Sequence, residues 1–273
     1  FSVLDGVYPV DGEITGLLVK DINGDGRDDV LQTHKGSWEV TVRLAGPGGK
    51  LGPPESQEIG EVPSASEITD INSDGVIDIV CSNLALPGSI SVRLGNSDGT
   101  FEPEMKFYLP ETTGGGRLLS IVTVDLDNDG VLDLASGYSD CRLSFFKGNG
   151  DGTFEHIQDH NFVHEPLDMV VADFDKDGDL DIAGVGFESD IAIVENEGDL
   201  FERERNGYTR HYYRPQNIDI RWSQDISVVD YNDDGNLDLI AGSDAGILVL
   251  TGGEGIRFSA ESRPLDGSPS FPA

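Results

Sequence analysis

Three features of the sequence predict an all-β protein, a β-propeller built of four-stranded blades. A nine-residue acidic pattern occurs five times, beginning at Asp21, Asp70, Asp125, Asp173 and Asp230, so that successive copies are 49, 55, 48 and 57 residues apart. Short runs of alternating apolar and polar residues, typical of β-strands, surround each copy. A repeat of about 50 residues made of strands is typical of a propeller or another radial β-repeat.

The expected elements follow the same order in every unit. An apolar strand leads into the acidic loop, an alternating strand leaves it, and a third strand, a Gly/Asn/Asp turn and a more polar fourth strand complete the unit. A single domain, residues 1–260, is expected to contain five such units, at about 14–60, 66–110, 118–163, 167–213 and 223–260. Residues 1–10 are expected to add a strand that closes the ring, and 261–273 to form a tail. The alternative is part of a six- or seven-bladed propeller.

The acidic loops indicate calcium binding. In the fourth copy, acidic residues occupy positions 1, 3, 5 and 9 between Asp173 and Asp181, and Gly178 occupies position 6. Oxygen ligands at alternate positions around a glycine-permitted turn suit a hard cation such as Ca²⁺. An EF-hand is excluded because it needs Glu at position 12 between two helices, whereas Gln, Cys, Ser, Gly and Ala occur there between strands. Metal-free hairpin turns remain the alternative.

The predicted ligands are the side chains at positions 1, 3, 5 and 9 and the backbone carbonyl at position 7, for about five calcium ions. They are Asp21, Asn23, Asp25, Arg27 and Asp29; Asp70, Asn72, Asp74, Val76 and Asp78; Asp125, Asp127, Asp129, Val131 and Asp133; Asp173, Asp175, Asp177, Asp179 and Asp181; and Asp230, Asn232, Asp234, Asn236 and Asp238. Position 3 is Asn in three loops and Asp in the third and fourth. We therefore expect the third and fourth loops to bind most tightly.

The loops resemble those of the FG-GAP/VCBS repeat, and two further segments strengthen the resemblance. These are Gly95–Phe101, with the sequence GNSDGTF, and Gly148–Phe154, with the sequence GNGDGTF. The family occurs in integrin α-chain heads, some fungal lectins and many bacterial secreted proteins. The resemblance implies that each repeat is one propeller blade with a calcium loop between its first two strands. It says less about function, because members of the family bind, adhere and catalyse.

Charge and composition restrict the classes of partner. The chain has 51 Asp and Glu residues against 18 Lys and Arg, a formal net charge of −33. This balance argues against nucleic acid or an anionic membrane as the main partner. No apolar run approaches the roughly 18 residues of a membrane span. The two cysteines, Cys81 and Cys141, form no disulfide framework, and a single bridge between adjacent repeats remains open.

A basic and aromatic stretch, residues 203–222, is the candidate ligand surface. It contains five arginines, and the residues we assign to ligand binding are Arg210, His211, Tyr212, Arg214 and Trp222. Aromatic faces there would stack on sugar rings or a peptide, and arginines would pair with carboxylates. The alternative is that these side chains neutralise nearby acids and fill space between blades. His156, His160 and His164, spaced every four residues, are expected at the surface.

These observations favour a calcium-stabilised binding module for carbohydrate or protein, secreted or on the cell surface and similar in role to lectins or adhesion proteins. Two alternatives remain: a polysaccharide-lyase type of enzyme and a structural module of a larger secreted protein. For a lyase, His211, Tyr212 and Arg214 form the candidate cluster. The sequence contains no nucleophile elbow, phosphate-binding loop, zinc-ligand spacing or HExxH run, and a binding role is therefore favoured over an enzyme.

Overall fold

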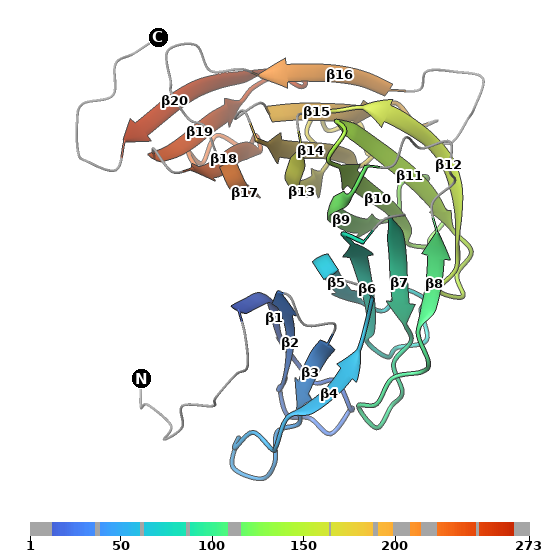
Figure 1. Ribbon diagram of the computed structural model, residues 1–273. Helices are drawn as coiled ribbons and strands as arrows, with labels where there is room; N and C mark the ends of the chain where they lie inside the picture. Colours follow the sequence, from blue (N-terminus) through green and yellow to red (C-terminus); the bar gives the residue numbers. More distant parts are fainter. Residues whose placement is uncertain are drawn as a thin grey trace.

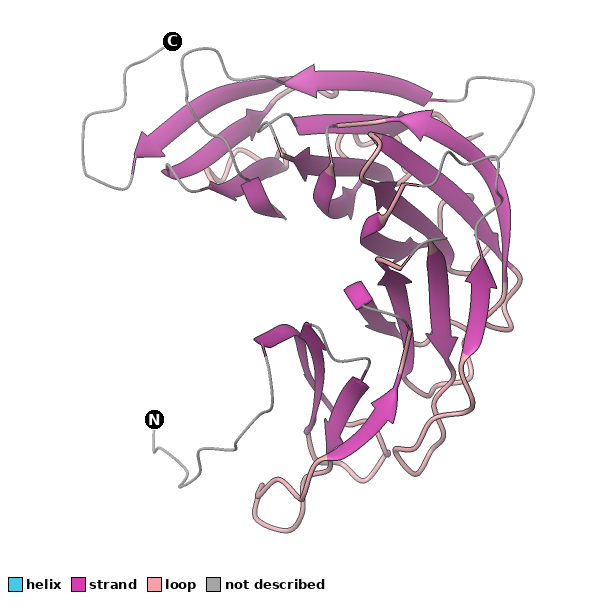
Figure 2. Cartoon of the chain, in the orientation of Figure 1, coloured by secondary structure: helices cyan, strands magenta, loops and turns pink. Residues whose placement is uncertain are grey.

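The computed structural model describes residues 13–35, 39–60, 63–85, 88–108, 116–163, 165–187, 191–198, 208–213, 223–243 and 246–264. Within these ranges the chain forms strands and turns without a helix (Figure 2), and so contains no helix that could cross a membrane. The strand expected within residues 1–10 lies outside the described part of the chain.

In the described ranges, twenty strands form five antiparallel sheets, here called blades, and each blade follows the chain order of its four strands. Blade 1 contains β1 (Glu13–Lys20), β2 (Asp29–Lys35), β3 (Glu39–Arg43) and β4 (Glu55–Glu58). Blade 2 contains β5 (Pro63–Thr69), β6 (Asp78–Asn83), β7 (Ser89–Arg93) and β8 (Met105–Tyr108). Blade 3 contains β9 (Leu118–Val124), β10 (Asp133–Tyr138), β11 (Arg142–Gly148) and β12 (Phe154–Asn161).

The last two blades repeat this arrangement. Blade 4 contains β13 (Pro166–Ala172), β14 (Asp181–Gly186), β15 (Ile191–Asn196) and β16 (Tyr208–Tyr213). Blade 5 contains β17 (Ser223–Val229), β18 (Asp238–Ser243), β19 (Gly246–Gly252) and β20 (Phe258–Pro264). The final strand thus continues four residues beyond the boundary at residue 260 that the sequence suggested.

The blades follow one another around an arc, with β1, β5, β9, β13 and β17 on its inner side and the fourth strand of each blade on its outer side (Figure 1). Blades 1 and 5 stand at the two ends of the arc. Hydrogen bonds join the inner strands of neighbouring blades: the Ser64 hydroxyl donates to the Leu118 carbonyl at 2.8 Å, and the Ser120 hydroxyl donates to the Pro166 carbonyl at 2.8 Å. The all-β fold with four-stranded blades confirms the prediction.

Four hydrophobic clusters fill the spaces between successive blades. In blades 2 to 5, the apolar residue at position 10 of the acidic loop unit enters the cluster shared with the preceding blade, as Ile79, Leu134, Ile182 and Leu239 do. The equivalent residue of blade 1, Val30, has no preceding blade in the arc and is only partly buried. Burial at this position therefore depends on the neighbouring blade.

In blades 1 to 4, position 2 of the loop packs in the other direction, into the cluster shared with the following blade. The residues that do so, all nearly fully buried, are Ile22, Ile71, Leu126 and Phe174. In blade 5 the same position holds Tyr231, whose exposed fraction is 46%. Each boundary between blades is thus built from position 2 of one loop and position 10 of the next.

The two cysteines lie in different surroundings and form no disulfide. Cys81 is buried in the cluster between blades 1 and 2, while Cys141 lies in the turn between β10 and β11. The possible bridge between adjacent repeats is therefore absent from the structure.

Candidate metal centres

All five acidic loops connect the first and second strands of a blade and share one backbone conformation. Positions 4 and 6 both have positive φ. At position 6 the glycines have φ of 82°, 88°, 85°, 101° and 84° in loop order, a conformation that side chains other than glycine rarely adopt. Position 4 is Gly24, Ser73, Asn128, Lys176 and Asp233, all left-handed as well. Two left-handed residues within three positions fold the loop back on itself and bring its acidic side chains together.

The first aspartate of each loop accepts two backbone hydrogen bonds. In the fourth loop, Asp173 accepts from Asp177 N at 3.1 Å and from Gly178 N at 3.2 Å, one on each carboxylate oxygen. The other four loops make the same pair of bonds at 2.8–3.1 Å. The position-5 carboxylate in turn accepts from the amide of position 7, for example Asp179 N to Asp177 Oδ1 at 2.9 Å. The backbone therefore fixes the orientation of the acidic side chains.

The aspartate at position 9 is fully buried in every loop. One of its oxygens accepts a hydrogen bond from the amide of position 2, and the other accepts from an amide at the end of the third strand. For Asp181 these donors are Phe174 N at 2.9 Å and Asn196 N at 2.8 Å. The same two bonds occur in all five blades at 2.7–3.0 Å. This residue, the first of the second strand, thus joins the loop to the second and third strands of the blade.

Burial raises the proton affinity of three position-9 aspartates, Asp78, Asp133 and Asp181. It raises the pKa of Asp181 to about 7 and that of Asp133 to about 6, and it also raises the pKa of Asp78. The two backbone donors act in the opposite direction, but desolvation of the charged form has the larger effect on the pKa. A nearby cation would stabilise the charged form of such a buried carboxylate.

Carboxylate oxygens converge most closely in the third and fourth loops, those with four acidic ligands. Oxygens of Asp125, Asp127 and Asp133 lie within 4.8 Å of one another, and oxygens of Asp173, Asp175 and Asp177 do the same. In the third loop, Asp127 Oδ1 is buried and has no hydrogen-bond partner among the described residues. A buried, unsatisfied carboxylate oxygen beside other carboxylates fits a bound cation, and donors that are all oxygen suit Ca²⁺.

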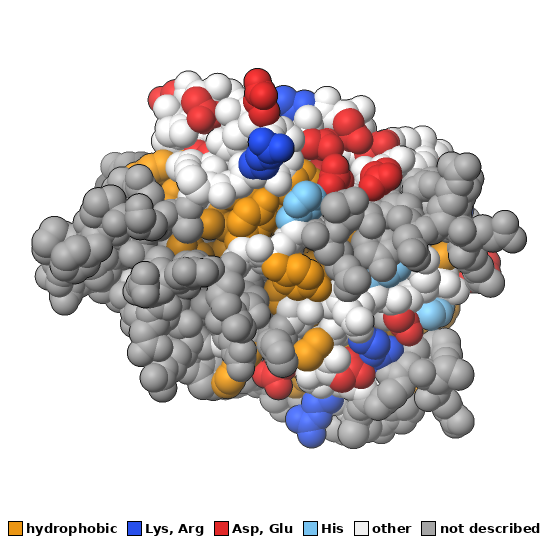
Figure 3. All heavy atoms as spheres, turned by 90° about the horizontal axis from the view of Figure 1, so that it is seen from above, with side chains coloured by type: hydrophobic (Ala, Val, Ile, Leu, Met, Phe, Trp, Pro, Cys, Tyr) orange, Lys and Arg blue, Asp and Glu red, His pale blue; other side chains and the backbone are white. Residues whose placement is uncertain are grey.

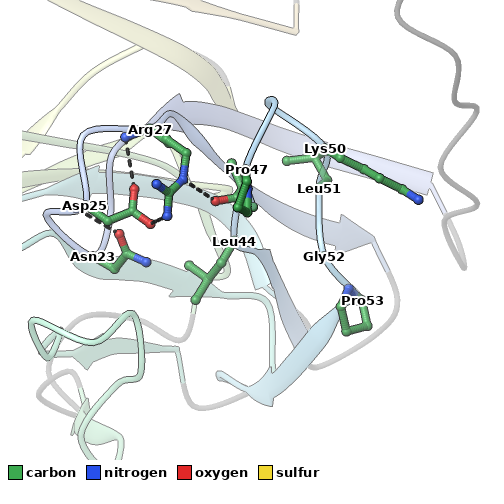
Figure 4. Close-up of a pocket in the computed structure, with 11 residues that line it drawn as sticks. Asn23, Asp25, Arg27, Leu44, Pro47, Lys50, Leu51, Gly52 and Pro53 are labelled. Atoms are coloured by element: carbon green, nitrogen blue, oxygen red, sulfur yellow. Dashed lines mark hydrogen bonds and ion pairs between the residues drawn. The ribbon is translucent and has the colours of Figure 1, made fainter.

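Basic side chains pair with acidic residues of the first and third loops. In the first loop, the Arg27 guanidinium pairs with Asp25 and its Nε donates to the Ala45 carbonyl at 2.7 Å, beside an open cleft of about 700 Å³ (Figure 4). In the third loop, Lys147 at the end of β11 pairs with Asp127 and lies 3.0 Å from Asp129. Lys147 was not among the residues predicted from the sequence, although it is the basic residue directly before Gly148.

Neighbouring loops contact one another along the same edge of the arc. The Asn128 side-chain amide donates to Asp179 at 2.8 Å, which joins the third loop to the fourth. The Lys176 ammonium donates to the Gly235 carbonyl at 2.8 Å and to Asn236 Oδ1 at 2.9 Å, which joins the fourth to the fifth. In both cases position 4 of one loop reaches position 7 of the next.

The candidate ligand surface is only partly described. His211 and Tyr212 lie on β16, opposite Ile193 and Ala192 respectively, so their side chains point to opposite faces of the strand. His211 bonds to Glu195 at 2.7 Å, whereas the exposed fraction of Tyr212 is 55%. The side chain of Arg210, and Arg214 and Trp222 as a whole, lie outside the described residues. Figure 3, seen from above, shows acidic side chains gathered in a group near several hydrophobic ones.

The histidine series corrects one prediction. His156 is partly exposed and pairs with Asp159 at 2.8 Å, but His160 is buried, with its ring 5.2 Å from that of Phe145. A register shift between β11 and β12 next to Phe145 places these two histidines on opposite faces, although a spacing of four would keep them on one face of a regular strand. His164 lies outside the described residues.

Comparison with known families identifies the repeated unit. The FG-GAP-like repeat matches residues 70–136 and 125–184, which contain the second, third and fourth acidic loops. This confirms the resemblance that the sequence suggested for that part of the chain. A comparison of the sequence with curated proteins finds no match.

Solved structures support the propeller fold. The chain is similar to an Agrocybe aegerita lectin whose structure describes recognition of non-reducing terminal N-acetylglucosamine, with a TM-score of 0.58 and 20% identity over 90% of this chain. It spans 65% of the length of that lectin. A protein from Lactobacillus plantarum is similar with a TM-score of 0.57 and 12% identity, over 86% of this chain and 67% of that one.

A third structure, BBS1N in complex with ARL6DN, is similar with a TM-score of 0.51 and 13% identity, over 94% of this chain and 91% of that one. At these identities the three likenesses establish the fold alone.

Proposed function

Because residues 70–184 carry FG-GAP-like repeats within a β-propeller, we propose that the protein is a calcium-stabilised extracellular binding module for a carbohydrate or protein ligand. The observation that carries the proposal is the fivefold repetition of one loop geometry. Each loop fixes its first aspartate with two backbone amides and its last with two more, and in the third and fourth loops carboxylate oxygens of three residues lie within 4.8 Å of one another.

Calcium would act here through structure. The side chains at positions 1, 3, 5 and 9 and the carbonyl at position 7 would hold the ion, which supplies the positive charge that three or four adjacent carboxylates need. Without it these carboxylates repel one another across a loop that connects two strands and bonds to a third. An ion that binds only the folded state stabilises it, by about 2.7 kcal/mol per site when its free concentration is 100 times the dissociation constant.

An extracellular location agrees with this chemistry. Extracellular calcium-binding modules have dissociation constants of about 10⁻⁴–10⁻³ M, so exposed loops with three or four carboxylates would be filled outside the cell. The net charge of −33 also suits a protein in contact with millimolar divalent cations.

For the ligand, two similar structures supply the classes to test. One is a lectin that recognises a terminal sugar, and the other is a complex with a second protein. The exposed Tyr212 on an outer strand offers an aromatic face of the kind that stacks on sugar rings or packs in a protein interface.

Calorimetric titration of chelator-treated protein with calcium tests the metal part of the proposal. We expect several ions to bind per chain and the thermal midpoint to rise with calcium; fewer than about two ions per chain would contradict the proposal. Asp177→Ala should reduce both effects. Asp98→Ala is the matched control, because Asp98 lies in an exposed turn where it bonds to Thr100 outside the loop pattern.

The ligand part needs a separate measurement. Fluorescently labelled, calcium-loaded protein applied to a glycan array should bind a defined group of glycans, and chelation should remove this binding. If no glycan is bound, a protein partner becomes the ligand class to search for. If circular dichroism shows that chelation also unfolds the protein, calcium affects glycan binding indirectly, through the fold. If the fold persists, calcium takes part in glycan binding directly.

A further inference from the structure

Lys147 occupies a position that no other blade fills with a basic residue. It lies directly before Gly148, whose amide donates to Asp133 Oδ1 at 2.9 Å. The same bond to the position-9 aspartate is made by Ala45, Gly95, Asn196 and Gly252 in the other blades. The residues preceding these, and so equivalent to Lys147, are Leu44, Leu94, Glu195 and Thr251.

The ammonium of Lys147 reaches the interior of the third loop. It bonds to Asp127 Oδ2 and lies 3.0 Å from Asp129 Oδ2, so it stands between positions 3 and 5 of the predicted ligand set. An oxygen of Asp127 is also within 4.8 Å of oxygens of Asp125 and Asp133. A positive charge that belongs to the chain is therefore placed among the carboxylates proposed to bind the ion.

This contact coincides with a local difference in hydrogen bonding. In the other four loops Oδ1 of the position-3 side chain accepts a bond from the amide of position 5, at 3.0–3.2 Å. In the third loop Asp127 bonds to Lys147 through Oδ2, and its Oδ1 is buried with no hydrogen-bond partner in the described structure. The lysine thus holds a ligand carboxylate away from the arrangement found in its sister loops.

We propose that Lys147 is a tethered counter-cation of the third loop, which calcium must displace from Asp127 and Asp129 when it binds. The inference rests on the proposed calcium binding. It adds a difference in calcium affinity between two loops that the number of acidic ligands does not predict. The third and fourth loops both offer four carboxylates, but the fourth has Glu195 where the third has Lys147. The third loop therefore binds calcium more weakly than the fourth.

Two glycine amides allow each loop to be followed separately. Gly130 N donates to Asp125 at 2.9 Å in the third loop, and Gly178 N donates to Asp173 at 3.2 Å in the fourth. In a calcium titration of ¹⁵N-labelled full-length protein, we expect the Gly130 resonance to reach its midpoint at higher free calcium than the Gly178 resonance. Gly178 serves as the internal reference in the same sample.

Lys147→Met removes the ammonium and keeps an unbranched apolar stem. We expect it to lower the calcium midpoint at Gly130 about two- to fivefold, the scale of removing one partly exposed competing ion pair, and to leave the midpoint at Gly178 unchanged. Lys147→Arg, which keeps the positive charge, should leave calcium binding by the third loop weak. Lys106→Met is the control for net charge, since Lys106 lies on β8 outside the loops and should shift neither resonance selectively.

The outcomes distinguish this inference from the proposed function. If calcium binds but Lys147→Met leaves the Gly130 midpoint unchanged or raises it, the counter-cation role is wrong while the calcium proposal stands. If no loop binds calcium, both fail. A selective shift at Gly130 that disappears when Lys147→Met is combined with Asp127→Asn, which removes the partner carboxylate, confirms the role through a double-mutant cycle.

Discussion

At the scale of single residues, the buried aspartates Asp133 and Asp181 make the stability of the metal-free protein depend on pH. The pKa of Asp181 is raised to about 7 and that of Asp133 to about 6, because burial penalises the charged carboxylate. An unfolded aspartate has a pKa of about 3.9. Between about pH 4 and pH 7 the metal-free folded state therefore holds more protons than the unfolded state, and its stability falls as the pH rises.

Calcium should reverse this dependence, because the ion takes the place of the protons. We expect the gain in thermal midpoint on adding calcium to be larger at pH 7.5 than at pH 5, measured by thermal unfolding with calcium and with chelator at both values. Glu67 on β5, whose pKa burial and Asp168 raise to about 7, lowers stability with rising pH with or without the metal. The difference between the thermal midpoints with calcium and with chelator therefore reports the contribution of the loops alone. An equal gain in midpoint at pH 5 and pH 7.5 would contradict the prediction.

At the scale of elements, local patterns were predictable and contacts between strands were not. The loops could be found from sequence because their ligands lie within nine residues and their turn depends on local glycines such as Gly178. Lys147 reaches Asp127 across twenty positions through the β10–β11 hairpin, and its role depends on strand register. His160 was misplaced for a related reason, since a register shift in β12 cannot be deduced from spacing.

Strand β16 shows the same limit for the candidate ligand surface. Residues adjacent in sequence point to opposite faces of a strand, so the aromatic pair Tyr212 and Tyr213 cannot form one surface. Tyr213 packs against blade 5, with its hydroxyl donating to the Ile256 carbonyl at 2.7 Å and its ring 5.4 Å from that of Phe258. Tyr212 is exposed.

These two tyrosines make a matched pair for mutation. Tyr213→Ala should destabilise the protein by about 2–4 kcal/mol because it removes a partly buried ring, whereas Tyr212→Ala should change stability by no more than about 0.5 kcal/mol. Urea unfolding of the calcium-loaded variants measures both. If Tyr212 contributes to ligand binding, its replacement should weaken capture of a glycan or protein identified by screening by about 1–3 kcal/mol. A large loss of stability in Tyr212→Ala would show that it packs internally.

At the scale of the whole molecule, the arc is held together by boundaries of one repeated design. Each boundary buries position 2 of one loop and position 10 of the next between two sheets, and hydrogen bonds such as Ile226 N to Asp168 Oδ2 at 2.9 Å link the inner strands. The period of the sequence predicted this stacking. It did not predict how far the residues at the two ends of the arc are exposed, because that depends on which surfaces have a neighbouring blade.

The side chain at position 2 of the loop should therefore contribute much more to the free energy of unfolding in blade 4 than in blade 5. Phe174, at position 2 of the fourth loop, is buried in the cluster between these blades, with its ring 5.9 Å from that of Phe258. Tyr231 occupies the equivalent position in blade 5 with an exposed fraction of 46%. Phe174→Ala should lower the free energy of unfolding by about 3–5 kcal/mol, while Tyr231→Ala should lower it by less than about 1 kcal/mol.

Urea unfolding at saturating calcium measures both losses, and a calcium titration of each variant checks that the metal loops remain intact. Leu126→Ala, at the same position between blades 3 and 4, extends the comparison and should cost about 2–5 kcal/mol, since this residue is 1% exposed. If Tyr231→Ala proved as costly as Phe174→Ala, the face of blade 5 that points away from blade 4 would have to be covered in solution. Concentration-dependent unfolding of the unmodified chain would then identify a second copy as the cover, because only an intermolecular contact makes stability depend on protein concentration.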